Sequence, residues 1–171
     1  GTANATRRGG SVDLYAGSVP SFGALADALA TGGFTGRQVI ELGSGDIAVE
    51  SGRTISADEV QLAADGGSIS VHGTIDARSR NGGSITLAAR DGVSILPGAD
   101  LEAGNTGGGE RGGRVSLQTS QGAVSIDQAA RVDVAGGTAH DAGTVTIGAP
   151  ATAAGVAIGD IGGQINCDGG V

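Results

Sequence analysis

The chain has 171 residues, of which 35 are glycine, and 39% are hydrophobic, almost all of them aliphatic. This hydrophobic content excludes a disordered chain, three prolines are too few for collagen, and no apolar run reaches the length of about 18 residues that a membrane span needs. The formal net charge is −8, and all ten basic residues are arginines, which argues against a nucleic-acid partner. We therefore expect a single folded domain rich in β-structure.

Residues 1–38 are expected to form one strand and an insertion. Residues 12–14 alternate between apolar and polar side chains, as a strand does, and residues 21–30 have apolar side chains at helical spacing (Phe22, Leu25, Ala26 and Leu29). Ser21 is a suitable N-cap, and Gly32 and Gly33 are a suitable stop. The pattern favours a short helix in an insertion between strands, and the alternative is a lid over an open end of the fold or a partner contact.

Residues 39–171 contain short alternating strands that recur as ordered sets of three. Gly83-Ser84-Ile85-Thr86-Leu87 returns as Gly113-Arg114-Val115-Ser116-Leu117 and as Gly143-Thr144-Val145-Thr146-Ile147, with a step of 30 residues both times. The expected triplets are residues 40–42, 47–49 and 55–57; 60–62, 69–71 and 75–77; 85–87, 93–95 and 101–103; 115–117, 124–126 and 132–134; and 145–147, 156–158 and 165–167.

One such strand is too short to bury a hydrophobic face, but three strands wrapped into a coil can point their aliphatic side chains inward. Stacked coils then pair each strand in parallel with its equivalent in the next coil. Glycines suit the corners, where left-handed or otherwise strained backbone costs them little. The sequence therefore predicts an all-β right-handed parallel β-helix (a β-solenoid) of about five three-strand coils. The alternative is an antiparallel sandwich or barrel, which does not require ordered triplets.

The runs GGSISVHGTIDARSRNGGSITLAARDGVSILPGADLEAG and GGRVSLQTSQGAVSIDQAARVDVAGG resemble the repeat region of filamentous haemagglutinin-type exoproteins. The resemblance extends over about residues 39–150. It implies that the chain is a segment of a longer β-helical rod, secreted to the bacterial cell surface through an outer-membrane partner. The expected function is structural and adhesive, in adhesion or biofilm formation, and the stalk of a contact-dependent inhibition exoprotein is an alternative. The expected partners are adjoining coils of the same longer chain and surface glycans or proteins.

A carbohydrate-active β-helix enzyme is the alternative from another functional class. Asp76, Glu102 and Asp133 occupy the middle of the third strand in successive coils, so they should point outward in one row. Such a row could bind a cation or supply an acid and a base. We favour a solvated outer face, name no catalytic residue and expect no cofactor.

The sequence contains only weak candidates for metal ligands. Gly43-Ser44-Gly45-Asp46-Ile47 partly matches a calcium-binding nonapeptide, but that mechanism needs tandem copies and only one is present. Cys167 is the single cysteine, and we interpret it as a small structural thiol near the end of the stack.

The corner after the third strand gathers basic residues. Because coils stack in register, loops at this corner should project from one edge, and insertions on one face of a repeat array often bind a partner. Arginines favour carboxylate and sulfate groups, so the functional interpretation is a weak site for acidic glycans. We favour the alternative of glycine-rich loops with solubilising charge. The residues expected at this edge are Arg78, Arg80, Arg111, Arg114 and His140.

The two ends of the stack are a further expected interaction surface. A solenoid has unpaired parallel strand edges at both ends, and such edges recruit other chains. We therefore expect end-to-end association unless residues 15–34 or 150–171 cover an end.

Overall fold

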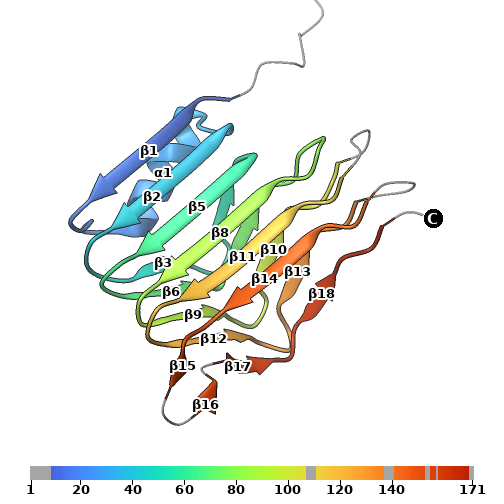
Figure 1. Ribbon diagram of the computed structural model, residues 1–171. Helices are drawn as coiled ribbons and strands as arrows, with labels where there is room; N and C mark the ends of the chain where they lie inside the picture. Colours follow the sequence, from blue (N-terminus) through green and yellow to red (C-terminus); the bar gives the residue numbers. More distant parts are fainter. Residues whose placement is uncertain (1–8, 107–110, 137–140, 153–154, 157, 170–171) are drawn as a thin grey trace, which may run out of the picture.

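Short parallel strands wind into stacked coils in the computed structural model, which describes residues 9–106, 111–136, 141–152, 155–156 and 158–169 (Figure 1). Sixteen of its eighteen described strands form five coils of three strands each and one further strand before them, and the other two form a short antiparallel pair. The fold is a right-handed parallel β-helix, as the sequence predicts. The triplet repeat is therefore the feature that determines the architecture.

Equivalent strands of successive coils form three parallel sheets. The first sheet contains β1 (Ser11–Ala16), β2 (Arg37–Leu42), β5 (Glu59–Ala64), β8 (Ser84–Ala89), β11 (Arg114–Thr119) and β14 (Thr144–Gly148). The second contains β3 (Ile47–Val49), β6 (Ser68–Val71), β9 (Gly92–Ile95), β12 (Ala123–Ile126) and β17 (Ile158–Ile161). The third contains β4 (Thr54–Ser56), β7 (Thr74–Asp76), β10 (Asp100–Glu102), β13 (Arg131–Asp133) and β18 (Gln164–Asn166).

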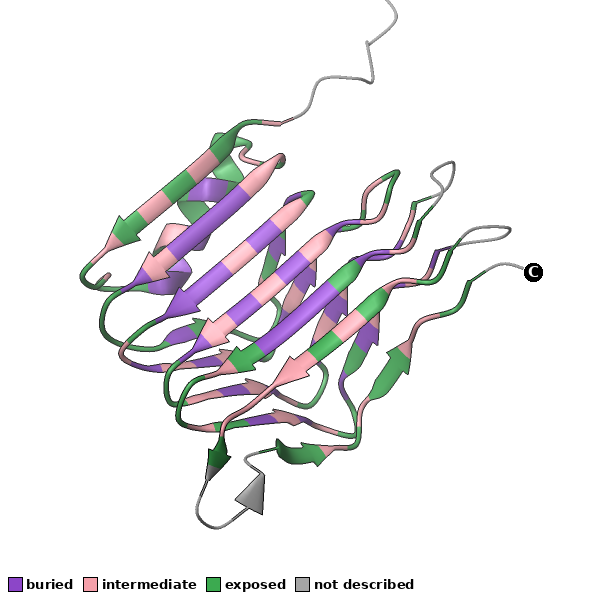
Figure 2. Ribbon diagram, viewed as in Figure 1, coloured by how far each residue is buried: buried purple, intermediate pink, exposed green. Residues whose placement is uncertain are grey.

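The register places like residues on top of one another. Val115 pairs with Ile85 in the coil before it and with Val145 in the coil after it, so the 30-residue step of the sequence is also the step of the ladder. Because side chains alternate along a strand, the inward rows are aliphatic except at Gln38, while most Ser, Thr and charged residues face outward (Figure 2). The Gln38 side-chain amide donates to the carbonyl oxygens of Phe34 and Ser56, which satisfies this buried polar group.

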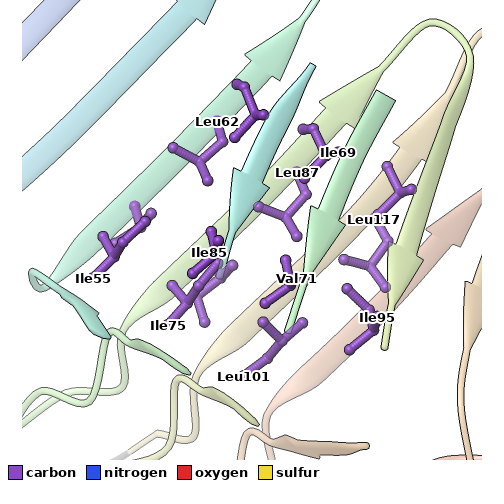
Figure 3. Packing of buried hydrophobic residues seen from close by; sticks show 14 of the residues in the cluster. Ile55, Leu62, Ile69, Val71, Ile75, Ile85, Leu87, Ile95, Leu101 and Leu117 are labelled. Carbon is purple, nitrogen blue, oxygen red and sulfur yellow. The ribbon is translucent and has the colours of Figure 1, made fainter. Parts of the chain in front are cut away.

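The interior is a set of continuous aliphatic rows (Figure 3). The largest side chains with under 2% exposure are Ile40, Leu42, Ile47, Leu62, Ile69, Ile75, Ile85, Leu87, Ile95, Leu101, Leu117 and Ile126. Each side chain of this size stabilises the fold by about 1.5–3 kcal/mol when it leaves water. The rows come from all three sheets, so every coil contributes to one core.

The glycines that precede the first strand of a coil are required by close backbone approach. A Cβ at Gly83 would collide with the carbonyl oxygen of Ala77, and one at Gly113 would collide with that of Ala103. Neither of these glycines has a positive φ. A left-handed backbone therefore does not explain Gly83 and Gly113. Close approach between the third strand of one coil and the first strand of the next requires glycine at these two positions.

Helix α1 (Phe22–Gly32) lies between β1 and β2 and covers the N-terminal end of the core. Ser21 caps it by accepting a hydrogen bond from the N–H of Ala24, and Gly33 ends it in a left-handed conformation. Its buried side chains belong to the same cluster as the aliphatic rows: Phe22, Ala26 and Leu29. The helix is inserted where expected, but it is also a lid, the alternative that the sequence analysis did not favour.

Arg53 fastens this helix to the first complete coil. Its Nη1 donates to the carbonyl oxygen of Gly23 at 2.8 Å and to the carboxylate of Asp27. Its Nη2 lies 3.3 Å from a carboxylate oxygen of Glu50 in the coil. The charged group therefore joins α1 to the turn between β3 and β4.

The last coil departs from the expected triplet. The sequence analysis placed its second strand at residues 156–158, whereas Val156 belongs to an antiparallel pair of β15 (Ala151–Thr152) and β16 (Gly155–Val156). The strand that continues the second sheet, β17, begins at Ile158. Ile158 and Ile161 supply its inward positions across a bulge, so a spacing of three residues replaces the strict alternation on which the prediction relied.

Substitution of Val115, which is fully buried in the middle of the stack, tests this packing. We expect Val115→Asp to lower the free energy of unfolding by about 3 kcal/mol or more, because it places an unpaired charge in an aliphatic row. Val115→Ile should cost about 1 kcal/mol or less. Urea unfolding of both variants measures the difference, and equal losses would show that Val115 faces water.

Candidate ligand-binding groove

The corner between the third and first sheets carries loops that stack in register. Ser79 and Asn105 form a parallel bridge, and so do Arg111 and Asp141. The N–H of Thr106 donates to the oxygen of Ser79 at 3.0 Å, which ties two successive loops together. The described residues of these corners therefore lie along one edge of the molecule (Figure 1).

An open groove of about 1130 Å³ runs along this edge. The short corners around Gly36 and Asp58 line one part of it, and the longer loop of residues 78–83 and the segments 111–114 and 141–144 line the rest. The step from short to long corners thus creates the hollow. The arginines that line it are Arg37, Arg78, Arg80, Arg111 and Arg114.

The groove is basic although the protein is acidic. Among the described residues that line it, five arginines outnumber the three carboxylates of Asp58, Glu59 and Asp141, a formal charge of +2, whereas the chain has a net charge of −8. Half of the ten basic residues of the chain thus line one surface. Such a local potential attracts anions.

The five arginines fall into two groups. Arg37 pairs with Asp13 and Glu59. The hydrogen bond to the Asp13 carboxylate raises the pKa of Arg37 most, and the hydrogen bond to Glu59 raises it further. Arg78 is likewise held by carboxylates of the third sheet. Arg80, Arg111 and Arg114 form no ion pair with any residue that the structure describes. These three exposed guanidinium groups (the free arginines) are the groups best placed to meet an external anion.

The sequence analysis anticipated most of this edge. The structure brings Arg78, Arg80, Arg111 and Arg114 together, and His140 lies outside the described residues. The sequence analysis did not include Arg37, although Arg37 and Arg114 are each the first residue of a strand in the first sheet. Aligning the first residues of the equivalent strands would have shown that Arg37 and Arg114 occupy the same position in the first sheet.

The outward carboxylates of the third sheet do form a row. Glu102 pairs in register with Asp76 on one side and with Asp133 on the other. Arg78 contacts Asp76 at 2.8 Å and Glu102 at 3.2 Å, and Arg131 contacts both Glu102 and Asp133. Two arginines therefore offset the repulsion between three stacked carboxylates.

The same carboxylates also end their strands. An oxygen of Asp76 accepts from the N–H of Arg78 at 3.1 Å, and an oxygen of Asp133 accepts from that of Ala135 at 3.0 Å. The side-chain hydrogen bond from Arg78, assisted by this backbone N–H, lowers the pKa of Asp76 despite its partial burial. The row that could have supplied an acid and a base is thus engaged in coil-to-coil contacts.

The other two residues considered for ligand or metal binding, Asp46 and Cys167, make contacts that support the fold. Asp46, from the partial calcium motif, accepts the N–H of Ser68 in the next coil at 2.8 Å. Cys167 is a free, half-buried thiol packed against the core. Within the described part of the chain, no three His, Cys, Asp or Glu residues cluster as a metal site would require.

Comparisons with protein-family models, curated proteins and solved structures found no match to this chain. Among the described residues, no helix is long and apolar enough to cross a membrane. The fold and the groove therefore carry the functional argument.

The Arg78–Asp76 pair predicts a specific pH dependence. A depressed pKa in the folded state means that the pair stabilises the fold above the ordinary carboxyl pKa and that this contribution is lost as pH falls through the folded value. Arg78→Gln should raise the pKa of Asp76 and lower the free energy of unfolding at neutral pH by about 1 kcal/mol or less, since the pair is half exposed. Urea unfolding at a series of pH values measures this difference.

The difference between the parent and Arg78→Gln should shrink as pH falls below the folded pKa of Asp76. Arg80→Gln is the control, because Arg80 lies in the same loop and has no ion pair among the described residues. A cost of Arg78→Gln that stays constant down to acidic pH would contradict the pairing.

Proposed function

We propose that this chain is a structural and adhesive segment of a secreted β-helical protein of the bacterial cell surface, and that its corner groove contacts acidic glycans. The observation that carries the proposal is the cluster of free arginines, Arg80, Arg111 and Arg114, on the edge of a rigid stack. The cadence of the coils, which resembles that of filamentous haemagglutinin-type repeats, supports the cellular setting.

The chemistry of the groove favours an extended anionic ligand over a small enclosed one. The hollow is open and polar, and its free arginines come from two successive corners, so they can engage several anionic groups along a chain. A guanidinium forms paired hydrogen bonds with carboxylate or sulfate. Because the groups are exposed to water, binding should be weak per site and sensitive to salt.

Multiplicity would offset this weakness. A surface rod that presents weak sites to a polyanionic chain gains avidity when several sites are engaged at once. The stacked corners provide such a linear arrangement, because Ser79 pairs with Asn105 and Arg111 with Asp141 in successive corners. The geometry therefore suits adhesion to a glycan polymer.

Binding of sulfated and sialylated glycans to immobilised protein tests the proposal. The triple variant Arg80→Ser, Arg111→Ser, Arg114→Ser should bind about tenfold or more weakly than the parent, since three charge-assisted contacts are removed. Arg78 is left in place because it pairs with the carboxylate row. Parent binding should fall as salt rises.

A charge-matched control separates the groove from net charge. Gln118→Glu, Ser120→Glu and Gln128→Glu change exposed residues that do not line the groove. Both triple variants change the net charge from −8 to −11, because each makes three changes of −1. Equal losses in the two variants, or salt-independent binding that neither reduces, would remove the groove from consideration.

A further inference from the structure

The groove contains unpaired carboxylates as well as the free arginines. Glu59 pairs with Arg37, whereas Asp58 and Asp141 form no ion pair with any residue that the structure describes. The side chains of Asp58 and Asp141 are both exposed. The groove therefore presents available negative charge beside its available positive charge.

These charges follow a fixed order along the stack. Strands β5, β8, β11 and β14 are neighbours in that order in the first sheet, so the corners before them follow one another at the strand spacing of about 4.8 Å. Asp58 lies in the first of these four corners and Asp141 in the last. Arg80 lies in the second corner, and Arg111 and Arg114 lie in the third. The free arginines thus occupy two successive corners, with a carboxylate in the corner on either side.

A second hollow of about 440 Å³ opens beside Asp58. Asp58 and Arg78 line both this hollow and the groove, so the two adjoin. Arg78 is already paired with Asp76, and the side-chain hydroxyls of Ser56 and Thr106 also line the second hollow. Its described residues therefore offer hydrogen-bonding groups without a free cation.

A carboxylate and a guanidinium suit different parts of a glycan. An ionised carboxylate only accepts hydrogen bonds, so Asp58 suits the hydroxyl groups of an uncharged sugar and repels an acidic one. A guanidinium only donates, and it suits carboxylate or sulfate groups. An unpaired charge that opposes one class of ligand is a recurrent source of specificity.

We propose that the groove binds a glycan in which acidic and neutral sugars alternate, and that Asp58 and Asp141 determine this preference. The free arginines hold the anionic group of an acidic sugar. Asp58 accepts hydrogen bonds from the hydroxyl groups of the neutral sugar beside it, where the second hollow opens. A uniformly acidic chain would instead place negative charge against a carboxylate in the corner on either side. The inference rests on the proposed function and names the class of glycan within it.

Two oligosaccharides with the same number of carboxylates test the preference. In hyaluronan, glucuronic acid alternates with neutral N-acetylglucosamine, whereas every sugar of an oligogalacturonate is acidic. The parent chain should bind the hyaluronan oligosaccharide about tenfold more tightly, because only the uniform chain brings negative charge to Asp58 and Asp141. Isothermal titration calorimetry at low salt measures both dissociation constants.

Asp58→Asn keeps the shape of the side chain and removes its charge. It should weaken binding of hyaluronan about fivefold, because a neutral amide oxygen accepts weaker hydrogen bonds than a carboxylate. It should strengthen binding of oligogalacturonate about fivefold, because the repulsion is removed. Asp141→Asn should likewise strengthen binding of oligogalacturonate.

The matched control is Asp65→Asn, which makes the same change of charge at an exposed residue that lines neither hollow. This control should leave the ratio of the two dissociation constants as it is in the parent. Circular dichroism checks that each variant folds. Opposite changes for the two ligands in Asp58→Asn, with no change of ratio in Asp65→Asn, are the expected result.

Absence of hyaluronan binding, or equal or tighter binding of oligogalacturonate by the parent, would overturn the inference. A change of both affinities in the same direction in Asp58→Asn would also overturn it. The proposed function would survive these results if the triple arginine variant still lost binding of sulfated and sialylated glycans. Glycan binding that persists undiminished in the triple variant would instead contradict the groove itself, and with it both proposals.

Discussion

Coverage of one aliphatic row by the next is the interaction on which the rest of this structure depends. None of the strands that the structure describes exceeds six residues, and none could bury a hydrophobic face by itself. Burial arises because each coil lies on another in register, so that Ile85, Val115 and their equivalents form continuous columns. The stability of each coil is thus a property of its neighbours, as nearest-neighbour descriptions of repeat proteins assume.

The same constraint explains the corners and the ends. A first strand can follow the third only if their backbones approach closely, which is why Gly113 has no room for a Cβ beside Ala103. The first coil needs a cover, and α1 supplies one. Its apolar face packs on the core, and hydrogen bonds from Arg53 hold it to the coil. The last coil lacks a described cover, and its aliphatic residues are correspondingly exposed.

The repeat made most of the fold predictable. Alternation and the 30-residue step indicated which residues face inward, and the structure places Val115, Leu117 and their equivalents there. The covering role of α1 was harder to predict than the inward residues of the coils. Helical spacing predicts an apolar face on the helix, but it does not indicate which part of the protein that face packs against. The bulge in β17 escaped prediction because Gly159 and Asp160 interrupt the alternation where the register of the described ladder shifts.

The candidate site was predictable in position but not in chemistry. Register alone gathers Arg78, Arg80, Arg111 and Arg114 at one edge, because equivalent corners must stack. Which of them are free depends on side-chain geometry that the sequence does not show. Arg78 pairs with Asp76, two residues before it, and with Glu102 in the next coil, whereas Arg80 forms no ion pair with a described residue. The distinction separates a structural arginine from a group available to a ligand.

Native-state amide hydrogen exchange, measured residue by residue, is the most direct test of coil-to-coil coverage. Exchange protection reports local opening, so coils covered on both sides should open least. We expect the slowest exchange in β5, β8 and β11, and faster exchange in β14 and β18 at a concentration where the chain is monomeric. Protection that is equal along the stack, or greatest in the last coil, would contradict the claim that each coil is stabilised by its neighbours.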